Sequence, residues 1–176
     1  MNFANKLTIF RVVLVPFFVL FVLTDFTSYN RLIALIIFII ATITDHFDGK
    51  IARKRNMVTS FGKFMDPIAD KLLVSSALIS LTALSKIPAW VVIVIISREF
   101  IISAVRLVAS DNGSVIAASA WGKAKTITQM AMIIIFLIDI AELYILSQIV
   151  MYAALILTIV SLIDYLIKNK SVIKFD

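Results

Sequence analysis

Four aspartates within one short stretch are the residues of this chain best suited to chemistry. Asp45 and Asp48 are three positions apart, and Asp66 and Asp70 are four positions apart. In a helix, either spacing places both carboxylates on one face. Long apolar runs flank the stretch, and carboxylates at the edge of hydrocarbon are costly unless they serve a function. The pattern predicts two antiparallel helices, with a turn between them, that direct four carboxylates into one cavity.

Four neighbouring carboxylates repel one another unless cations lie between them. Oxygen ligands favour hard divalent ions, so we expect Mg²⁺ or Mn²⁺ in a site for phosphate oxygens. Zinc is less expected because the chain has no Cys and a single His. That residue, His46, lies on a face rotated away from Asp45 and Asp48, and we interpret it as packing or interfacial. Basic residues beside the acids supply charge for a phosphate ligand: Arg53, Lys54, Arg55 and Lys63.

The composition places the chain in a membrane. Hydrophobic residues make up 61% of it and the mean hydropathy is +1.04, which excludes a soluble globular protein. Backbone groups in lipid must be hydrogen-bonded within their own segment, so the fold class is all-α. Residues 1–11, where Asn5, Thr8 and Arg11 recur every three positions, are expected to form a short interfacial segment. We expect one domain, residues 1–176, with six transmembrane helices near 8–24, 31–55, 63–84, 88–110, 119–138 and 143–168.

The net charge of +6 does not indicate nucleic acid, because the basic residues are spread over short loops between apolar spans. An anionic membrane surface and an anionic substrate explain it better. With six spans and an internal N-terminus, fourteen Lys and Arg residues lie on the cytoplasmic side, whereas only Arg31 and Lys86 lie outside. Both termini are therefore predicted to be cytoplasmic. Asp45 lies about ten residues before Arg55, hence ~15 Å deeper, at the level of lipid head groups and upper acyl chains.

Small residues accompany the aspartates. Gly49 and Ala52 would let a ligand approach the backbone closely, although small residues are also common where membrane helices touch. Gly62 suits a turn or a helix entry.

A second group of charges lies further along the chain. Arg98 falls within an apolar span, where a charge is expensive, so it faces either a cavity or a carboxylate such as a structural ion-pair partner. Arg106, Lys123 and Lys125 are predicted to meet at the cytoplasmic ends of the fourth and fifth helices and to bind a phosphate. The alternative for the two lysines is snorkelling to lipid head groups.

The aspartate stretch fits a known pattern in full. Its fixed positions are Asp45-x-x-Asp48-Gly49-x-x-Ala52-Arg53, eight residues, Gly62-x-x-x-Asp66-x-x-x-Asp70. This resembles the complete motif of the CDP-alcohol phosphotransferases, integral membrane enzymes of phospholipid synthesis. Eight fixed positions make the match highly specific, and none departs from the pattern.

The resemblance implies roles for these residues. The four aspartates would hold metal ions, and we expect two ions. Asp70 would also be the general base on the acceptor hydroxyl. The donor would be CDP-diacylglycerol, and CMP would be the released product. Donor-site positions would be Gly49, Ala52, Arg53 and Gly62, with Thr8 a weaker candidate.

Two further stretches, Ser97-Arg98-Glu99-Phe100 and residues 118–126, resemble the branch of the family whose acceptor is glycerol 3-phosphate. Arg106, Lys123 and Lys125, with Arg98 assisting, would then bind the acceptor phosphate. The family also implies a homodimer. The protein is expected to be a multi-pass protein among the lipids of a bacterial plasma membrane, with its active site facing the cytoplasm.

Two alternatives stay open. Enzymes with the same motif use inositol phosphate, serine or phosphatidylglycerol as acceptor. A carboxylate-based ion transporter would instead spread its acids over several spans or broken helices, whereas here they cluster at one end beside basic residues.

Overall fold

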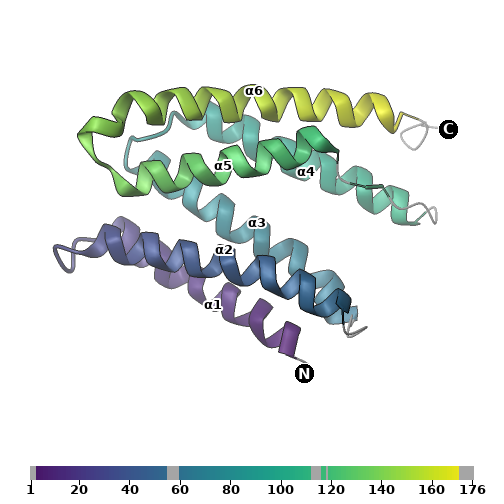
Figure 1. Cartoon of the computed structure of the whole chain (residues 1–176), viewed down its shortest axis with the longest axis horizontal. Coiled ribbons are helices and arrows are strands. Elements are labelled where there is room, and N and C mark those ends of the chain that lie inside the picture. Colours follow the sequence, from purple (N-terminus) through teal and green to yellow (C-terminus); the bar gives the residue numbers. More distant parts are fainter. Residues whose placement is uncertain (1–2, 55–59, 112–115, 118, 171–176) are drawn as a thin grey trace. The chain divides into compact units, whose positions relative to one another are not determined.

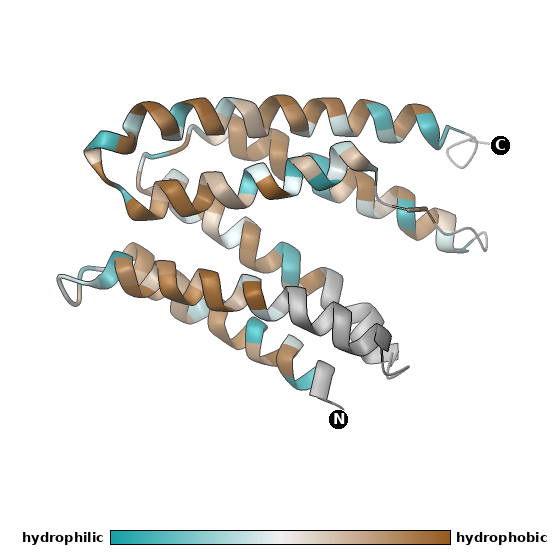
Figure 2. Ribbon diagram, in the orientation of Figure 1, coloured by the Kyte–Doolittle hydropathy of each residue, from teal (hydrophilic) through white to brown (hydrophobic). Residues whose placement is uncertain are grey.

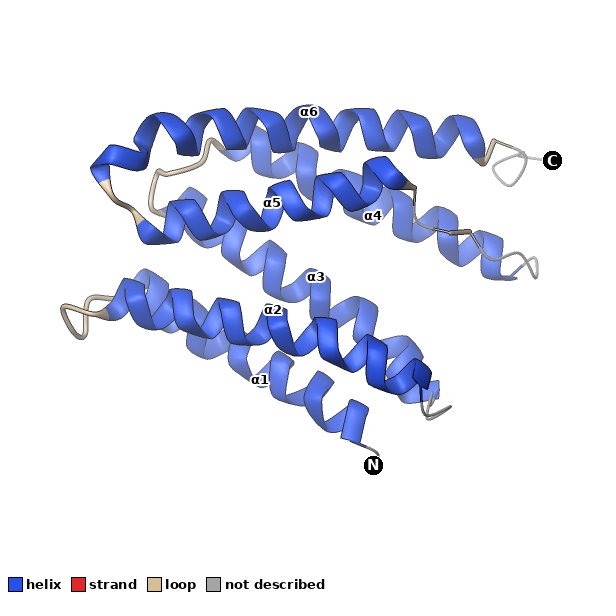
Figure 3. Cartoon of the chain, in the orientation of Figure 1, coloured by secondary structure: helices blue, strands red, loops and turns tan. Residues whose placement is uncertain are grey.

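The computed structural model describes the chain except residues 1–2, 55–59, 112–115, 118 and 171–176, and for residues 3–4, 45–54, 60–64, 66 and 67 it describes the backbone alone. Every element in these described ranges is a helix (Figure 3), which confirms the all-α class. Contacts divide the chain into a first unit, Met1–Ile87, and a second unit, Pro88–Asp176. The elements are α1 (Phe3–Leu23), α2 (Asn30–Lys54), α3 (Ser60–Ala83), α4 (Ala89–Asp111), α5 (Ala120–Ile138), the 3₁₀ turn η1 (Ala141–Leu143) and α6 (Tyr144–Lys168) (Figure 1).

All six predicted helices are present, and most of their ends lie within about three residues of the expected positions. The largest difference is at the start of α1, which is helical from Phe3. The predicted interfacial segment is therefore continuous with the first span. Whether residues 1–176 form one domain stays a prediction, and each unit is described by itself.

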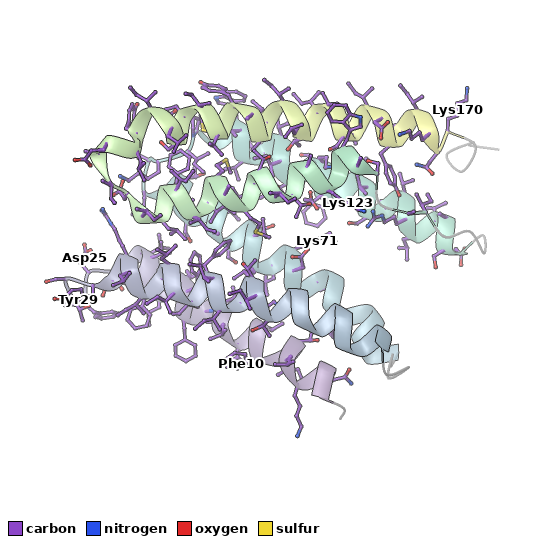
Figure 4. The ribbon with its side chains drawn as sticks, in the orientation of Figure 1. Phe10, Asp25, Tyr29, Lys71, Lys123 and Lys170 are labelled. Carbon is purple, nitrogen blue, oxygen red and sulfur yellow. The ribbon has the colours of Figure 1, made fainter. Side chains whose placement is uncertain are left out.

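A single buried side chain, that of Asn30, fixes the turn between α1 and α2. Its Oδ1 accepts hydrogen bonds from the backbone N of Thr27 at 2.9 Å and from the Thr27 hydroxyl at 3.0 Å. Its Nδ2 donates to the carbonyl of Thr24. Asn is favoured where a helix begins because its side chain replaces backbone partners that the turn lacks. The turn makes α1 and α2 antiparallel neighbours, with Asp25 and Tyr29 at its surface (Figure 4).

The interior of the first unit combines small and large apolar side chains. α1 packs against both α2 and α3. Ala34 and Ala41 on α2 are fully buried, so the helix backbones can approach closely, as membrane helices often do. The rings of Phe18 and Phe38, both fully buried, lie 5.9 Å apart between centroids.

α3 ends in a tight turn before the second unit begins. Ser85 adopts a left-handed conformation with φ of 57°, and the backbone N of Lys86 donates to the carbonyl of Leu81 at 2.9 Å. This pattern closes many helix C-termini. Pro88 then precedes α4, and its carbonyl accepts from the backbone N of Val91 at 3.1 Å. Both features match the break expected between the helices near 63–84 and 88–110.

The caps of α5 set the limits of the helical hairpin that it forms with α6. The Ser119 hydroxyl accepts a hydrogen bond from the backbone N of Gly122 at 3.1 Å, which is a typical N-cap. At the other end Asp139 is left-handed, with φ of 51°. η1 follows directly and leads into α6. Within this unit, α6 packs along α5 and also against α4.

Three segments are long and apolar enough to cross a membrane by length and composition, among the residues that the structure describes. They are residues 5–23 of α1, all of α5, and 141–168, which joins η1 to α6; α2 adds a shorter apolar stretch, Asn30–Thr44. Figure 2 shows hydrophobic residues along most of α6, with polar residues toward its ends. These segments support an integral membrane protein, whereas the count of six spans stays a prediction.

Candidate active site

The motif aspartates lie on two helices of the first unit, at matching distances from the joint between them. Asp48 lies six residues before the end of α2, and Asp66 six residues after the start of α3. Asp45 and Asp70 lie nine and ten residues from the same two ends. With a rise of 1.5 Å per residue, the four positions occupy two levels, about 9 Å and about 14 Å along the helices. Counted from these two helix ends, Asp48 and Asp66 share one level and Asp45 and Asp70 share the other.

Of these four carboxylates, the structure describes the side chain of Asp70 alone, and it is partly buried. The side chains of the other three lie outside the described residues, as do those of Ala52 and Arg53; at Gly49 and Gly62 only the helical backbone is described. Among the side chains that are described, no group of three or more His, Asp or Glu residues is placed to hold a metal ion. The motif supplies oxygen ligands only, and this donor set fits Mg²⁺ or Mn²⁺.

A buried polar face on α1 is a second feature of the first unit. Asn5, Thr8 and Arg11 are 6%, 0% and 1% exposed. Their spacing of three puts them on one side of the helix, and that side faces the packed interior of the unit. An interfacial helix would turn the same face to water and head groups. Residues 1–11 were expected at the membrane interface. The structure instead buries Thr8 and Arg11 inside the first unit.

This polar face lies at the level of the aspartates. Thr8 lies fifteen residues before the end of α1, and Asp45 lies fifteen residues after the start of α2. Because the same short turn joins the two helices, both residues lie about 22 Å from it. The same count puts Asn5 level with Asp48. Thr8 was predicted as a donor-site residue, whereas Asn5 and Arg11 were not, and their regular spacing was the only signal in the sequence.

In the second unit, a cluster of charged side chains joins α4 and α5. Glu99 accepts a hydrogen bond at Oε1 from Arg98 Nη1 at 3.0 Å and another at the same atom from Lys125 Nζ. The side chains of Arg98 and Lys125 are 9% and 3% exposed, and that of Glu99 is 25% exposed. Two cations thus share one carboxylate, and we call these three residues the ion cluster.

α6 completes the ion cluster through a hydroxyl. Arg98 Nε donates to Ser161 Oγ at 3.2 Å, and Ser161 donates in turn to the carbonyl of Thr158 at 3.0 Å. Both α6 residues are fully buried. The sequence predicted a carboxylate or a cavity for Arg98 and the structure supplies Glu99, but the sequence gave no sign of Ser161, which lies 63 positions away.

The two remaining basic residues of the predicted acceptor site are exposed. Arg106 lies with its guanidinium carbon 5.8 Å from the ring centroid of Tyr165, a cation–π contact. Lys123 is exposed near the start of α5 (Figure 4). Lys125 is two positions further along, which turns it to the opposite side of the helix. The structure therefore divides the predicted basic residues into a buried pair, Arg98 and Lys125, and an exposed pair, Arg106 and Lys123.

Comparison with known proteins covers nearly the whole chain. Residues 1–160 match the CDP-alcohol phosphatidyltransferase family. The CDP-diacylglycerol–glycerol-3-phosphate 3-phosphatidyltransferase of Bacillus subtilis is 41% identical over 98% of this chain and 97% of its own length. The enzyme of the same name from Haemophilus influenzae is 45% identical over 94% of this chain and 91% of its own. A probable phosphatidylglycerophosphate synthase of Mycobacterium tuberculosis is 44% identical over 93% and 79%. The chain, with its complete aspartate motif on α2 and α3, therefore belongs to the CDP-alcohol phosphatidyltransferase family.

Proposed function

We propose that this protein transfers the phosphatidyl group of CDP-diacylglycerol to sn-glycerol 3-phosphate, giving phosphatidylglycerol phosphate and CMP. The observation that carries the proposal is the complete motif on α2 and α3, with its aspartates paired in level by the helix register. Relatives named for this reaction match over almost their full length. The ion-transport alternative has no comparable support.

In the proposed reaction the acceptor hydroxyl attacks the phosphorus on the lipid side of the diphosphate, and the bond from this phosphorus to CMP breaks. Asp70 takes the proton of the hydroxyl as general base. Asp45, Asp48 and Asp66, with Asp70, would hold divalent metal; two ions, Mg²⁺ or Mn²⁺, are proposed because oxygen ligands favour hard divalent ions. When bound, the metal would neutralise charge on the diphosphate and polarise the reacting phosphorus.

In this proposal, the two substrates bind to different groups of residues. The CDP end of the donor binds to Gly49, Ala52, Arg53 and Gly62, together with Thr8.

The acceptor phosphate is assigned to the exposed pair, Arg106 and Lys123, assisted by the ion cluster that contains Arg98 and Lys125. This cluster supports the assignment because two of the predicted basic residues, Arg98 and Lys125, meet there at one carboxylate, and such cations form charge-assisted hydrogen bonds with phosphate oxygens.

A screen of acceptors tests the proposal. Purified protein with labelled CDP-diacylglycerol should prefer glycerol 3-phosphate over inositol phosphate, serine and phosphatidylglycerol. Arg106→Ala should raise the KM for glycerol 3-phosphate roughly tenfold to a hundredfold, because a charged hydrogen bond is lost, while the KM for the donor changes little. Preference for another acceptor would refute the acceptor assignment, and a donor-specific effect of Arg106→Ala would move this residue to the donor site.

We further propose a homodimer in a bacterial plasma membrane, with both termini and the active site on the cytoplasmic side, as the distribution of basic residues indicates. The chain has no Cys, so single cysteines report the topology. Ser28→Cys, in the turn after α1, and Lys170→Cys, just beyond α6 (Figure 4), should react with an impermeant thiol reagent from opposite sides of the membrane. Reaction of both from one side would contradict an even number of spans.

A further inference from the structure

Arg11 is the charged residue of the buried polar face on α1. It is 1% exposed and lies within the segment of α1 that is long and apolar enough to cross a membrane. A buried guanidinium is stabilised by nearby negative charge, and in a membrane protein such a residue usually marks a functional site. We therefore expect a negative group near Arg11.

The first unit has few acidic residues that could be the negative group near Arg11. Residues 1–87 contain five acidic residues, namely Asp25 and the four motif aspartates. Asp25 is exposed beyond the far end of α1 (Figure 4), fourteen residues from Arg11 and about 20 Å away along the helix. Within this unit, therefore, the negative charge near Arg11 comes from the motif or from a ligand that the motif binds.

The position of Arg11 along α1 agrees with a partner at the motif. Arg11 lies twelve residues before the end of α1, level with Thr42 on α2 and one turn short of Asp45. Because side chains on a helix lean toward its N-terminus, we expect the guanidinium of Arg11 near the level shared by Thr8 and Asp45. The buried polar face thus presents its cation at the depth of the aspartates.

Charge balance distinguishes the ligand from the carboxylates as the main partner during catalysis. Two divalent ions would balance the four carboxylates and leave the two negative charges of a bound diphosphate. A fixed guanidinium at that depth compensates one of these two charges and can donate two parallel hydrogen bonds to phosphate oxygens. Resting on the function proposed above, we propose that Arg11 is a binding residue for the diphosphate of the CDP-linked donor.

Binding of CDP in the presence of Mg²⁺, measured by calorimetry on purified protein, tests this directly. Arg11→Gln should weaken CDP binding roughly tenfold to a hundredfold and raise the KM for CDP-diacylglycerol by a similar factor. The KM for glycerol 3-phosphate should stay within about twofold. Lys6→Gln is the matched control, because it removes a positive charge from the same end of α1 at an exposed position, and it should bind CDP like the wild type.

Two results would overturn the inference. If folded Arg11→Gln binds CDP like the wild type and only its thermal unfolding changes, Arg11 is a structural counter-ion of the aspartates. If Arg11→Gln does not fold, Arg11→Lys decides, because lysine keeps the charge but not the paired donors; CDP affinity equal to that of the wild type would then refute the proposal. Failure of the proposed function looks different, since wild-type protein would then not bind CDP or would not use glycerol 3-phosphate.

Discussion

Asp48→Asn should abolish transfer to every acceptor, with a loss of roughly a thousandfold or more in kcat. The change keeps the size of the side chain but removes one of the charges that would hold the metal. Stabilisation of transition-state charge by a bound ion is worth several kcal/mol, and each 1.36 kcal/mol corresponds to a factor of ten. Release of labelled CMP from CDP-diacylglycerol in detergent micelles gives the measurement.

Asp25→Asn is the control for this variant. Asp25 carries the same charge but lies exposed in the turn between α1 and α2, at the opposite end of these helices from the motif. Its activity should be close to that of the wild type. More than a tenth of wild-type activity in Asp48→Asn would contradict a metal-binding role for this aspartate.

Removal of divalent metal should have an effect of similar size. Activity should vanish in excess chelator and return with Mg²⁺ or Mn²⁺, because the motif carboxylates repel one another and cannot bind a diphosphate without cations between them. A ligand that binds only the folded protein also stabilises it. Mg²⁺ should therefore raise the thermal unfolding temperature of the wild type, and less so for Asp48→Asn. Full activity in chelator would rule out the metal site.

Helix positions in this chain could be predicted because apolar runs end at strong turn signals. Pro88 and the turn at Asp139 mark helix ends by local chemistry alone. The start of α1 was harder, because polar residues near a chain end resemble an interfacial helix. Spacing shows that Asn5, Thr8 and Arg11 share a face, but only the packing of α1 on its neighbours shows that this face is buried.

A shared helix face can be predicted where residues are close in sequence, whereas pairings between different helices cannot. Asp45 and Asp48 are near neighbours, so their common face follows from helix geometry. The partners of Glu99 come from α4 and α5, and Ser161 comes from α6. Such pairings depend on how helices pack and rotate against one another, and no local pattern in the sequence encodes them.

The ion cluster of the second unit has a consequence for biogenesis. α4 is not among the segments of the described chain that are apolar enough to cross a membrane by themselves, and a charged residue at the centre of a span costs about 2.5–3.5 kcal/mol during translocon insertion. Lys125 becomes available only after α5 is synthesised, and Ser161 only when most of α6 has left the ribosome. We therefore expect insertion of α4 to be less stable until α6 is made, because a nascent polypeptide truncated before residue 161 lacks the Ser161 hydroxyl that accepts a hydrogen bond from Arg98.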